Sequence, residues 1–412
     1  METSRIPLRR NRDFNLLWTS QAVSDLGTRV ADIAFPLLVL ASTGSPGRAG
    51  IVGFAGTLPI FVFSLFAGAL VDRANRKRLM IVCDLVRSLA FASLVVAMLA
   101  GSVTFGHIVA VAFIEGTGYV FFSVAERSAL PQVVTDDQLP DALARNQARE
   151  YTSLLAGQPL GGILFALGRS IPFLINSVSY FLSVLTLSRI GVEFQAERAT
   201  PPGRVVAEVK EGVAWFWRQP FVRDSQLLVT GSDFTLNALY LVVIVLARQR
   251  GASAPVIGLM FAFLGIGGLL GTLVAPWLAK RLSMRTVVVA TMWLGAALVP
   301  LLIAIPGRLT PGVLYGAMVL LHPTWNAVVG AYRLRITPNE LQGRVQSVST
   351  LLSLGSVPFG ALLAGFLLQA VGTTPTILVL TGVMVVVAVC AIGSPAIRHA
   401  PDRAGAALQT PA

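Results

Sequence analysis

Residues 68–80 read GALVDRANRKRLM, and this stretch sets four basic side chains between two long apolar runs. The runs cover residues 49–71 and 79–100. Each holds the roughly 20 mostly apolar residues that a helix needs to cross a bilayer. A short basic turn between two such runs predicts two spanning helices whose connection stays in the cytoplasm.

Composition extends this interpretation to the whole chain. Of its 412 residues, 54% are hydrophobic and 13% are charged, whereas a soluble domain carries about 25% charged residues. So few charges exclude an ordinary cytosolic enzyme, and the apolar content excludes a disordered chain. The net charge of +12 fits basic loops rather than nucleic-acid binding. Cys83 and Cys390 form no CxxC pair, so no zinc site, other metal site or disulfide framework is expected.

Over the whole chain, the apolar pattern predicts twelve spanning helices. Residues 1–13 form a basic tail, and the apolar stretch after it is too long for a cleaved signal, so it is interpreted as an uncleaved first span. The predicted spans are 14–41, 49–71, 79–100, 106–126, 147–168, 171–190, 225–247, 256–279, 286–305, 311–331, 345–371 and 375–395.

The distribution of positive charge predicts the orientation. With the N-terminus inside, 25 of the 32 Lys and Arg residues fall in inner segments and 5 in outer segments. Because Lys and Arg collect in cytoplasmic loops, this bias predicts both termini in the cytoplasm and a multi-pass protein of the inner (plasma) membrane.

The two halves of the sequence resemble each other. Residues 50–73 are similar to 258–281, and residues 145–161 are similar to 344–360. A repeat in the same orientation predicts two six-helix bundles related by pseudo-symmetry. The predicted parts are a tail at 1–13, bundles at 14–190 and 224–395, a cytoplasmic linker at 191–223 with an amphipathic helix at Val205–Arg218, and a tail at 396–412.

The turn at 68–80 resembles the loop 2–3 signature G-x-x-x-D-R-x-G-R-R of the major facilitator superfamily, with Asn75 in place of the second glycine. Residues 14–27, 129–147, 157–162 and 340–349 also resemble that superfamily, most closely its macrolide-efflux and enterobactin-exporter branch. The resemblance implies a twelve-helix transporter in which this loop latches the two halves on the cytoplasmic side.

The latch interpretation assigns roles to individual residues. Arg76 is expected to bridge to Glu126 at the inner end of span four, and Asn75 is expected to tolerate a left-handed turn. The alternative is that these residues only anchor the loop inside. The predicted cytoplasmic gate consists of Gly68, Asp72, Arg73, Arg76, Lys77, Glu126 and Arg344.

Span five contains GQPLGG at residues 157–162, which resembles the antiporter signature G-P-x-G-G of drug-efflux members. The resemblance implies export rather than import. The residues themselves predict close packing, because small side chains one turn apart let helices approach, although such pairs are common in membrane bundles. The predicted packing motif is Gly157, Pro159, Gly161 and Gly162.

Ionisable residues inside spans are costly and indicate function. Span one carries Asp25, Arg29 and Asp32 at spacings that place all three on one helix face. They predict either a proton site facing a central cavity or a permanent ion-paired triad. For Asp32 the proton role is favoured, because one arginine cannot satisfy two acids.

Other candidates are spread over both halves. Glu115 in span four has no local basic partner, and Asp233 in span seven has Asn237 one turn on; either acid could carry protons or pair with a cationic substrate. Asp84 and Arg87 are expected to form a structural ion pair, while His322 in span ten is either a packing residue or a switch.

The chain lacks the GxxxxGK[ST], HExxH and GxSxG motifs, so neither ATP hydrolysis nor an enzyme is expected. The predicted function is proton-coupled efflux of a small amphipathic compound such as an antibiotic, drug or secondary metabolite. A siderophore exporter, a proton-coupled uptake symporter and an integral-membrane enzyme are the alternatives. The expected partners are substrate, protons and lipid, with no cofactor beyond the proton gradient and a monomeric state.

Overall fold

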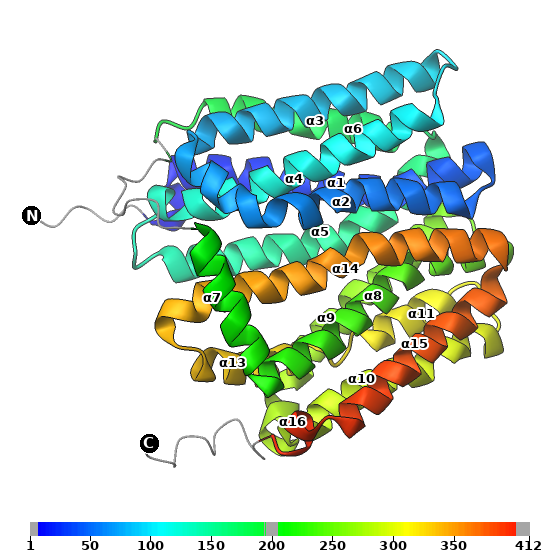
Figure 1. Ribbon diagram of the computed structural model, residues 1–412. Coiled ribbons are helices and arrows are strands. Elements are labelled where there is room, and N and C mark those ends of the chain that lie inside the picture. Colours follow the sequence, from blue (N-terminus) through cyan, green and yellow to red (C-terminus); the bar gives the residue numbers. More distant parts are fainter. Residues whose placement is uncertain (1–6, 193, 195–204, 401–412) are drawn as a thin grey trace, which may run out of the picture. The chain divides into compact units, whose positions relative to one another are not determined.

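The computed structural model describes residues 7–192, 194 and 205–400, and every regular element in that part is helical (Figure 1). Contacts divide the chain into an N-terminal unit that holds most of α1 to α6 and a C-terminal unit that holds α7, α8 and most of the later helices. The N-terminal elements are η1 (Leu8–Arg10), α1 (Arg12–Thr43), α2 (Pro46–Arg73), α3 (Arg76–Leu99), α4 (Phe105–Val133), α5 (Leu139–Leu167) and α6 (Ile171–Ser188). The later elements are α7 (Val205–Arg218), α8 (Pro220–Gln249), α9 (Ala254–Arg281), α10 (Met284–Ala304), α11 (Thr310–Met318), α12 (His322–Trp325), η2 (Asn326–Gly330), α13 (Ala331–Ile336), η3 (Asn339–Leu341), α14 (Gln342–Ala370), α15 (Thr373–Gly393) and α16 (Pro395–Arg398).

Eleven helical stretches among the described residues are long and apolar enough to cross a membrane. They coincide with eleven of the twelve predicted spans, and the all-helical expectation is confirmed. The remaining span, the fifth, coincides with α5, which is 29 residues long. Because α5 begins at Leu139 rather than 147, it includes a charged first part with Asp141 and Arg145.

The turn between α2 and α3 differs from the expected left-handed conformation. Asn75 is extended, with φ −69° and ψ 107°, and its side-chain oxygen accepts the backbone N–H of Arg78 at 3.0 Å. It therefore caps α3 by satisfying a backbone donor that the first helical turn leaves free. The family's glycine is replaced by a residue that starts the next helix.

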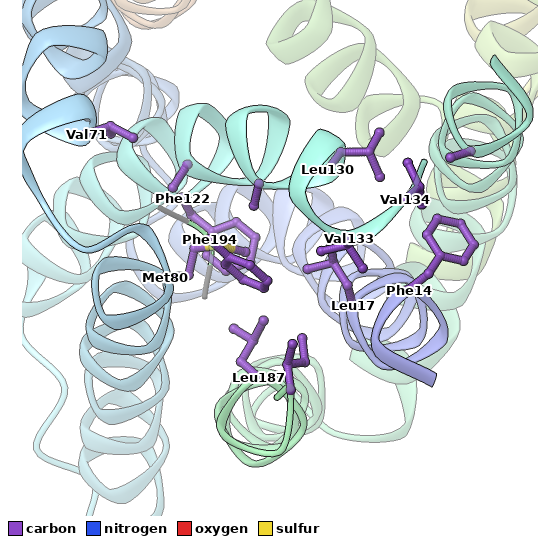
Figure 2. Close-up of a cluster of buried hydrophobic side chains, with 14 of the residues drawn as sticks. Phe14, Leu17, Val71, Met80, Phe122, Leu130, Val133, Val134, Leu187 and Phe194 are labelled. Carbon is purple, nitrogen blue, oxygen red and sulfur yellow. The ribbon is translucent and has the colours of Figure 1, made fainter. Parts of the chain in front are cut away.

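A cluster of apolar side chains closes the N-terminal unit at the end that carries the α2–α3 turn, here called the basic end (Figure 2). Phe14 and Leu17 of α1 lie near Leu130 and Val133 of α4, and Leu187 of α6 lies below them (Figure 2). Close packing of these side chains stabilises the unit through many van der Waals contacts. The cluster fixes the ends of the helices that carry the polar residues described below.

Small residues bring α1 and α5 close together. A Cβ atom at Gly161 would lie 2.6 Å from the carbonyl oxygen of Val30, and one at Gly157 would collide with Arg29. The predicted packing residues Gly161 and Gly162 are buried, and Pro159 lies inside α5. The glycines therefore allow a backbone approach that any larger residue would prevent.

The linker helix α7 spans the residues of the predicted amphipathic helix and packs on α8 and α14 of the C-terminal unit (Figure 1). Phe216 is fully buried against Val222 and Val345, whereas Trp217 is exposed. Glu211 forms an ion pair with Arg344. The helix is thus attached by one apolar face, as its sequence pattern predicts.

Span ten was expected as one helix over 311–331 and is instead broken. The chain leaves α11 at Met318, resumes as α12 at His322, and continues through the π-helical segment η2 into α13. Pro323 has no backbone N–H, and the N–H of His322 reaches Val319 at 3.1 Å in a tighter turn. A proline one residue after His322 was the available signal for this interruption.

Candidate functional site

The N-terminal unit contains a polar cavity of about 300 Å³ between α1, α3, α4 and α5. Phe122 and Leu130 of the apolar cluster form part of its wall. The charged residues that line it are Asp25, Arg29, Arg87, Glu126, Arg127, Arg149 and Glu150. Water-filled space beside buried charges is where intramembrane chemistry is expected.

Arg149 of α5 holds two carboxylates at this cavity. Its guanidinium lies 2.9 Å from Asp25 Oδ2 and 2.9 Å from Glu126 Oε1, and it also donates to Gln21. The Arg149 side chain is 3% exposed, whereas that of Asp25 is 33% exposed. One buried cation is therefore shared by two acids, one of which reaches the cavity.

Arg87 of α3 forms a second and deeper cluster. It donates to Glu115 through Nε at 3.0 Å and through Nη2, to Asp84 at 3.2 Å and to the Tyr180 hydroxyl. Its guanidinium also lies 3.9 Å from the centre of the Tyr180 ring. Asp84 and Tyr180 have no exposed surface. A Cβ at Gly118 would meet the Arg87 side chain, so that glycine provides its space.

This cluster corrects one expectation and fits another. Glu115 was expected to lack a basic partner, but Arg87 holds it from 28 positions earlier in the chain. The expected pair of Asp84 and Arg87 is present.

The triad expected on α1 is divided between two partners. Arg29 pairs with Asp32 at 3.2 Å, and both side chains are 39% exposed. Asp25 is ion-paired with Arg149 instead of Arg29. Among the described residues of this unit, the ion pairs join three arginines to five carboxylates. The paired groups hold two more acids than cations.

The expected bridge from Arg76 to Glu126 is replaced by other contacts. Arg76 donates to the carbonyl oxygens of Ser128 at 3.3 Å and Phe194 at 3.2 Å. Glu126 pairs with Arg149, which comes from a different helix. Arg76 thus binds backbone at the basic end, and Glu126 belongs to the cavity.

The other predicted gate residues are spread over both units. Lys77 donates to the Ile190 carbonyl, Arg73 is exposed, and Gly68 has open space where a Cβ would lie. The Asp72 side chain lies outside the described residues. Arg344 pairs with Glu211 of the linker helix.

The C-terminal unit has a polar network that contains mostly neutral groups. Asp233 is hydrogen-bonded to Ser353, whose hydroxyl accepts from Gln226 at 2.9 Å. Gln226 in turn accepts from Arg333 at 3.3 Å, and Asn237 donates to the Asp233 carbonyl at 2.8 Å. In the described part of the chain no Lys or Arg pairs with Asp233. His322 is half-buried at the break in span ten.

Three residues at these clusters were not identified from sequence. Arg149 was counted with the inner loop charges, although its position within 147–168 places it on a span. Thr28 and Tyr180 gave no signal, because a hydroxyl inside a span is common. The described residues include no group of three or more His, Cys, Asp or Glu side chains that could hold a metal ion.

Comparison with known proteins gives consistent matches. A family model described as transmembrane secretion effector matches residues 3–407. Multidrug efflux pump Tap of Mycolicibacterium fortuitum is 29% identical over 397 residues, which cover 90% of this chain and 93% of that protein. Macrolide efflux protein A of Streptococcus pyogenes is 24% identical over 203 residues, or 49% of this chain and 50% of that protein.

The fold is also found among solved structures. A crystal structure of a mutant of the nucleoside transporter NupG has a TM-score of 0.75 at 12% identity, covering 92% of this chain and 100% of the other. Because the family match spans nearly the whole sequence, this cell-membrane protein is a transporter and not an enzyme, and it belongs to the transmembrane secretion effector family of the major facilitator superfamily.

Proposed function

We propose that this transporter exports a small amphipathic organic compound in exchange for protons, by alternating access between its two bundles. The names of its relatives, a multidrug efflux pump and a macrolide efflux protein, support efflux of such compounds. Both termini and the basic end then lie in the cytoplasm, as the distribution of Lys and Arg predicts.

The observation that carries the proton coupling is the sharing of Arg149 by Asp25 and Glu126. With both acids ionised, the cluster has one uncompensated negative charge in a place where isolated charges are expensive. Binding one proton neutralises the cluster, and Asp25 is open to the cavity to exchange it. When the cavity then opens to the other side of the membrane, the bound proton is released there. Its movement down the gradient supplies the free energy for export.

The energy available is sufficient. One proton crossing a membrane potential of 100 mV supplies about 2.3 kcal/mol. A tenfold gradient of a neutral compound requires about 1.4 kcal/mol. A single proton per cycle therefore supports a gradient of more than tenfold.

We assign substrate contacts to residues in both units. Arg29 and Asp32 are half exposed on α1. Within the described residues, Asp233 of the C-terminal unit is an acid that pairs with no Lys or Arg, and Asn237 and His322 add an amide and an imidazole. An acid of this kind attracts a cationic group of a substrate.

The test uses purified protein in proteoliposomes, with erythromycin as the probe and an imposed proton gradient. We expect uphill erythromycin transport in the wild type, abolished by a protonophore. Asp25→Asn is expected to lose the response to the gradient, and the exposed Asp136→Asn serves as a matched control that retains it. In an efflux-deficient host, expression of the wild type should raise the inhibitory concentration of erythromycin.

Two results would contradict the proposal. Transport that is unaffected by the protonophore would exclude proton coupling. Coupling that is unchanged in both Asp25→Asn and Glu126→Gln would exclude the Arg149 cluster as its origin.

A further inference from the structure

We infer that Glu115 is a second, partly buried proton site, and that the hydroxyl groups of Thr28 and Tyr180 conduct protons to it from the cavity. This inference rests on the proposed proton-coupled export and identifies further residues that serve it. The two hydroxyls come from α1 and α6, and Glu115 comes from α4. The path therefore forms only where these three helices pack together.

The path is an unbroken series of hydrogen-bonded oxygens. Thr28 lines the cavity, and its Oγ1 lies 2.8 Å from the Tyr180 hydroxyl. Tyr180 Oη lies 2.8 Å from Glu115 Oε1. Thr28 Oγ1 also lies 3.0 Å from the Ser24 carbonyl oxygen.

The same positions of the heavy atoms satisfy two arrangements of hydrogens. With Glu115 ionised, Thr28 donates to Tyr180 and Tyr180 donates to Glu115. With Glu115 protonated, Glu115 donates to Tyr180, Tyr180 donates to Thr28, and Thr28 donates to the Ser24 carbonyl. In both arrangements Tyr180 also accepts from Arg87. Every hydroxyl hydrogen has an acceptor in each state, as buried polar groups generally do.

Conversion between the arrangements transfers one proton. A hydronium ion in the cavity gives a proton to Thr28 Oγ1 and becomes water. The original Thr28 proton moves to Tyr180, and the Tyr180 proton moves to Glu115 Oε1. The net change is one proton taken from the cavity and bound by the carboxylate, and reversal returns it.

The charges around the site explain why a proton can reside there. Arg87 of α3 contacts Glu115 directly and also holds Asp84, and Tyr180 contacts Glu115 from α6. Arg29 and Asp32 of α1 lie farther off as a pair. Cys83 lies near Asp84 and Arg87 on α3, and Tyr119 of α4 lies near the Arg29–Asp32 pair. Because the pair on α1 is neutral, the local balance is one cation against two acids, as at Arg149.

The two acids of this cluster differ in their connection to the cavity. Asp84 accepts from Arg87 and from the Ser183 hydroxyl, which is hydrogen-bonded onward to the buried Ser20. Neither serine lines the cavity. Of these two acids, only Glu115 is joined to the cavity by hydroxyl groups whose hydrogen bonds can reverse their direction.

The test separates proton movement from substrate movement. Erythromycin counterflow between equal pools requires no net proton transfer, whereas accumulation driven by a proton gradient does. We expect Tyr180→Phe, which keeps the ring over Arg87, to lower gradient-driven accumulation at least about tenfold, in line with the effect of losing a positioned proton-transfer group. Counterflow should remain close to that of the wild type.

Matched variants make the result specific. Tyr315→Phe removes another buried hydroxyl, one that donates to the Leu236 carbonyl in the C-terminal unit, and should retain both activities. Glu115→Gln should reproduce the defect of Tyr180→Phe. If Tyr180→Phe does not fold, Thr28→Val provides the same test, with Thr117→Val on α4 as its control.

The outcomes distinguish this inference from the function on which it rests. A wild type without gradient-driven accumulation would refute the proposed function and this site together. A coupled wild type whose Tyr180→Phe and Glu115→Gln variants are equally coupled would overturn only the inference. Coupling lost in Glu115→Gln but retained in Tyr180→Phe would mean that Glu115 exchanges directly through its own exposed surface, and would overturn the relay.

Discussion

The two units present different interiors on related helical scaffolds. In the N-terminal unit, Arg87 and Arg149 are buried and each binds two carboxylates. In the C-terminal unit, Arg333 donates to the amide oxygens of Gln226 and Gln346, and Asp233 is held by a hydroxyl. A buried ion pair is easily unbalanced by one proton, whereas an amide network is not. The described buried ion pairs thus lie in the N-terminal unit, whereas the network around Asp233 in the C-terminal unit holds mostly neutral groups.

The largest contrast is expected from removing one arginine in each unit. Arg87→Met leaves Asp84 and Glu115 without their cation, and breaking a buried pair in this way costs about 3–5 kcal/mol. Arg333→Met removes hydrogen bonds to neutral amides, at a cost of about 1.5–3 kcal/mol. Both losses of stability can be measured from the thermal unfolding of the purified variants. Adding Glu115→Gln and Asp84→Asn to Arg87→Met should recover part of the loss, and equal losses in the two units would contradict the contrast.

Helix packing in both units should be equally sensitive to a methyl group added at a close-packed glycine. A Cβ at Gly116 would collide with the backbone of Gly56, and one at Gly316 with the backbone of Phe263. Overpacking of this kind costs about 1–3 kcal/mol, so Gly116→Ala and Gly316→Ala should both lower the unfolding temperature. Gly268→Ala meets open space and should raise it slightly, because alanine favours a helix over glycine. A loss confined to one unit would show that their packing has also diverged.

A charge change at Asp233 should alter selectivity rather than coupling. Its carboxylate has no cation partner in the described residues, so Asp233→Asn should weaken binding of cationic ethidium about tenfold, the equivalent of 1.4 kcal/mol. Binding of a neutral probe should be unchanged, and gradient-driven transport of that probe should persist. Loss of proton coupling in Asp233→Asn would move a proton site into the C-terminal unit and remove the distinction between the halves.

The smallest effect is expected at the linker helix. The Glu211 side chain is 61% exposed in its pair with Arg344, and an exposed ion pair contributes about 0–1 kcal/mol. Glu211→Gln should therefore leave the unfolding temperature nearly unchanged. Phe216→Ala, which empties a buried position on the same helix, is the sensitive comparison. A large loss in Glu211→Gln would show that charge, not apolar contact, attaches α7.

The sequence predicted the helices well because a span is a local property. The apolar runs locate the eleven candidate spans, and the repeat indicated two related halves. The errors occurred where local chemistry competes with the hydrophobic pattern. Asn75 acts as a helix cap because its side chain reaches the Arg78 amide. Span ten breaks beside Pro323 although most of its residues are apolar.

The candidate site was only partly predictable, because its pairs join distant residues. Asp25 and Glu115 were recognised as costly acids within spans, and Glu126 was recognised as a gate residue expected to pair with Arg76. Their actual partners could not be assigned, since Arg87 and Arg149 come from other helices. Spacing along one helix favoured Arg29 for Asp25, but the close approach of α5 at Gly157 presents a second cation. Only tertiary packing determines which arginine is available.

The broken span ten has a consequence for local stability. Its pieces contain nine, four, five and six residues, and helices shorter than about 12 residues have little stability of their own. Their order therefore depends on the neighbouring helices α9 and α10. Amide hydrogens near His322 should exchange with solvent deuterium sooner than those of the unbroken α4, making this stretch a sensitive reporter of any compound that tightens or loosens its surroundings.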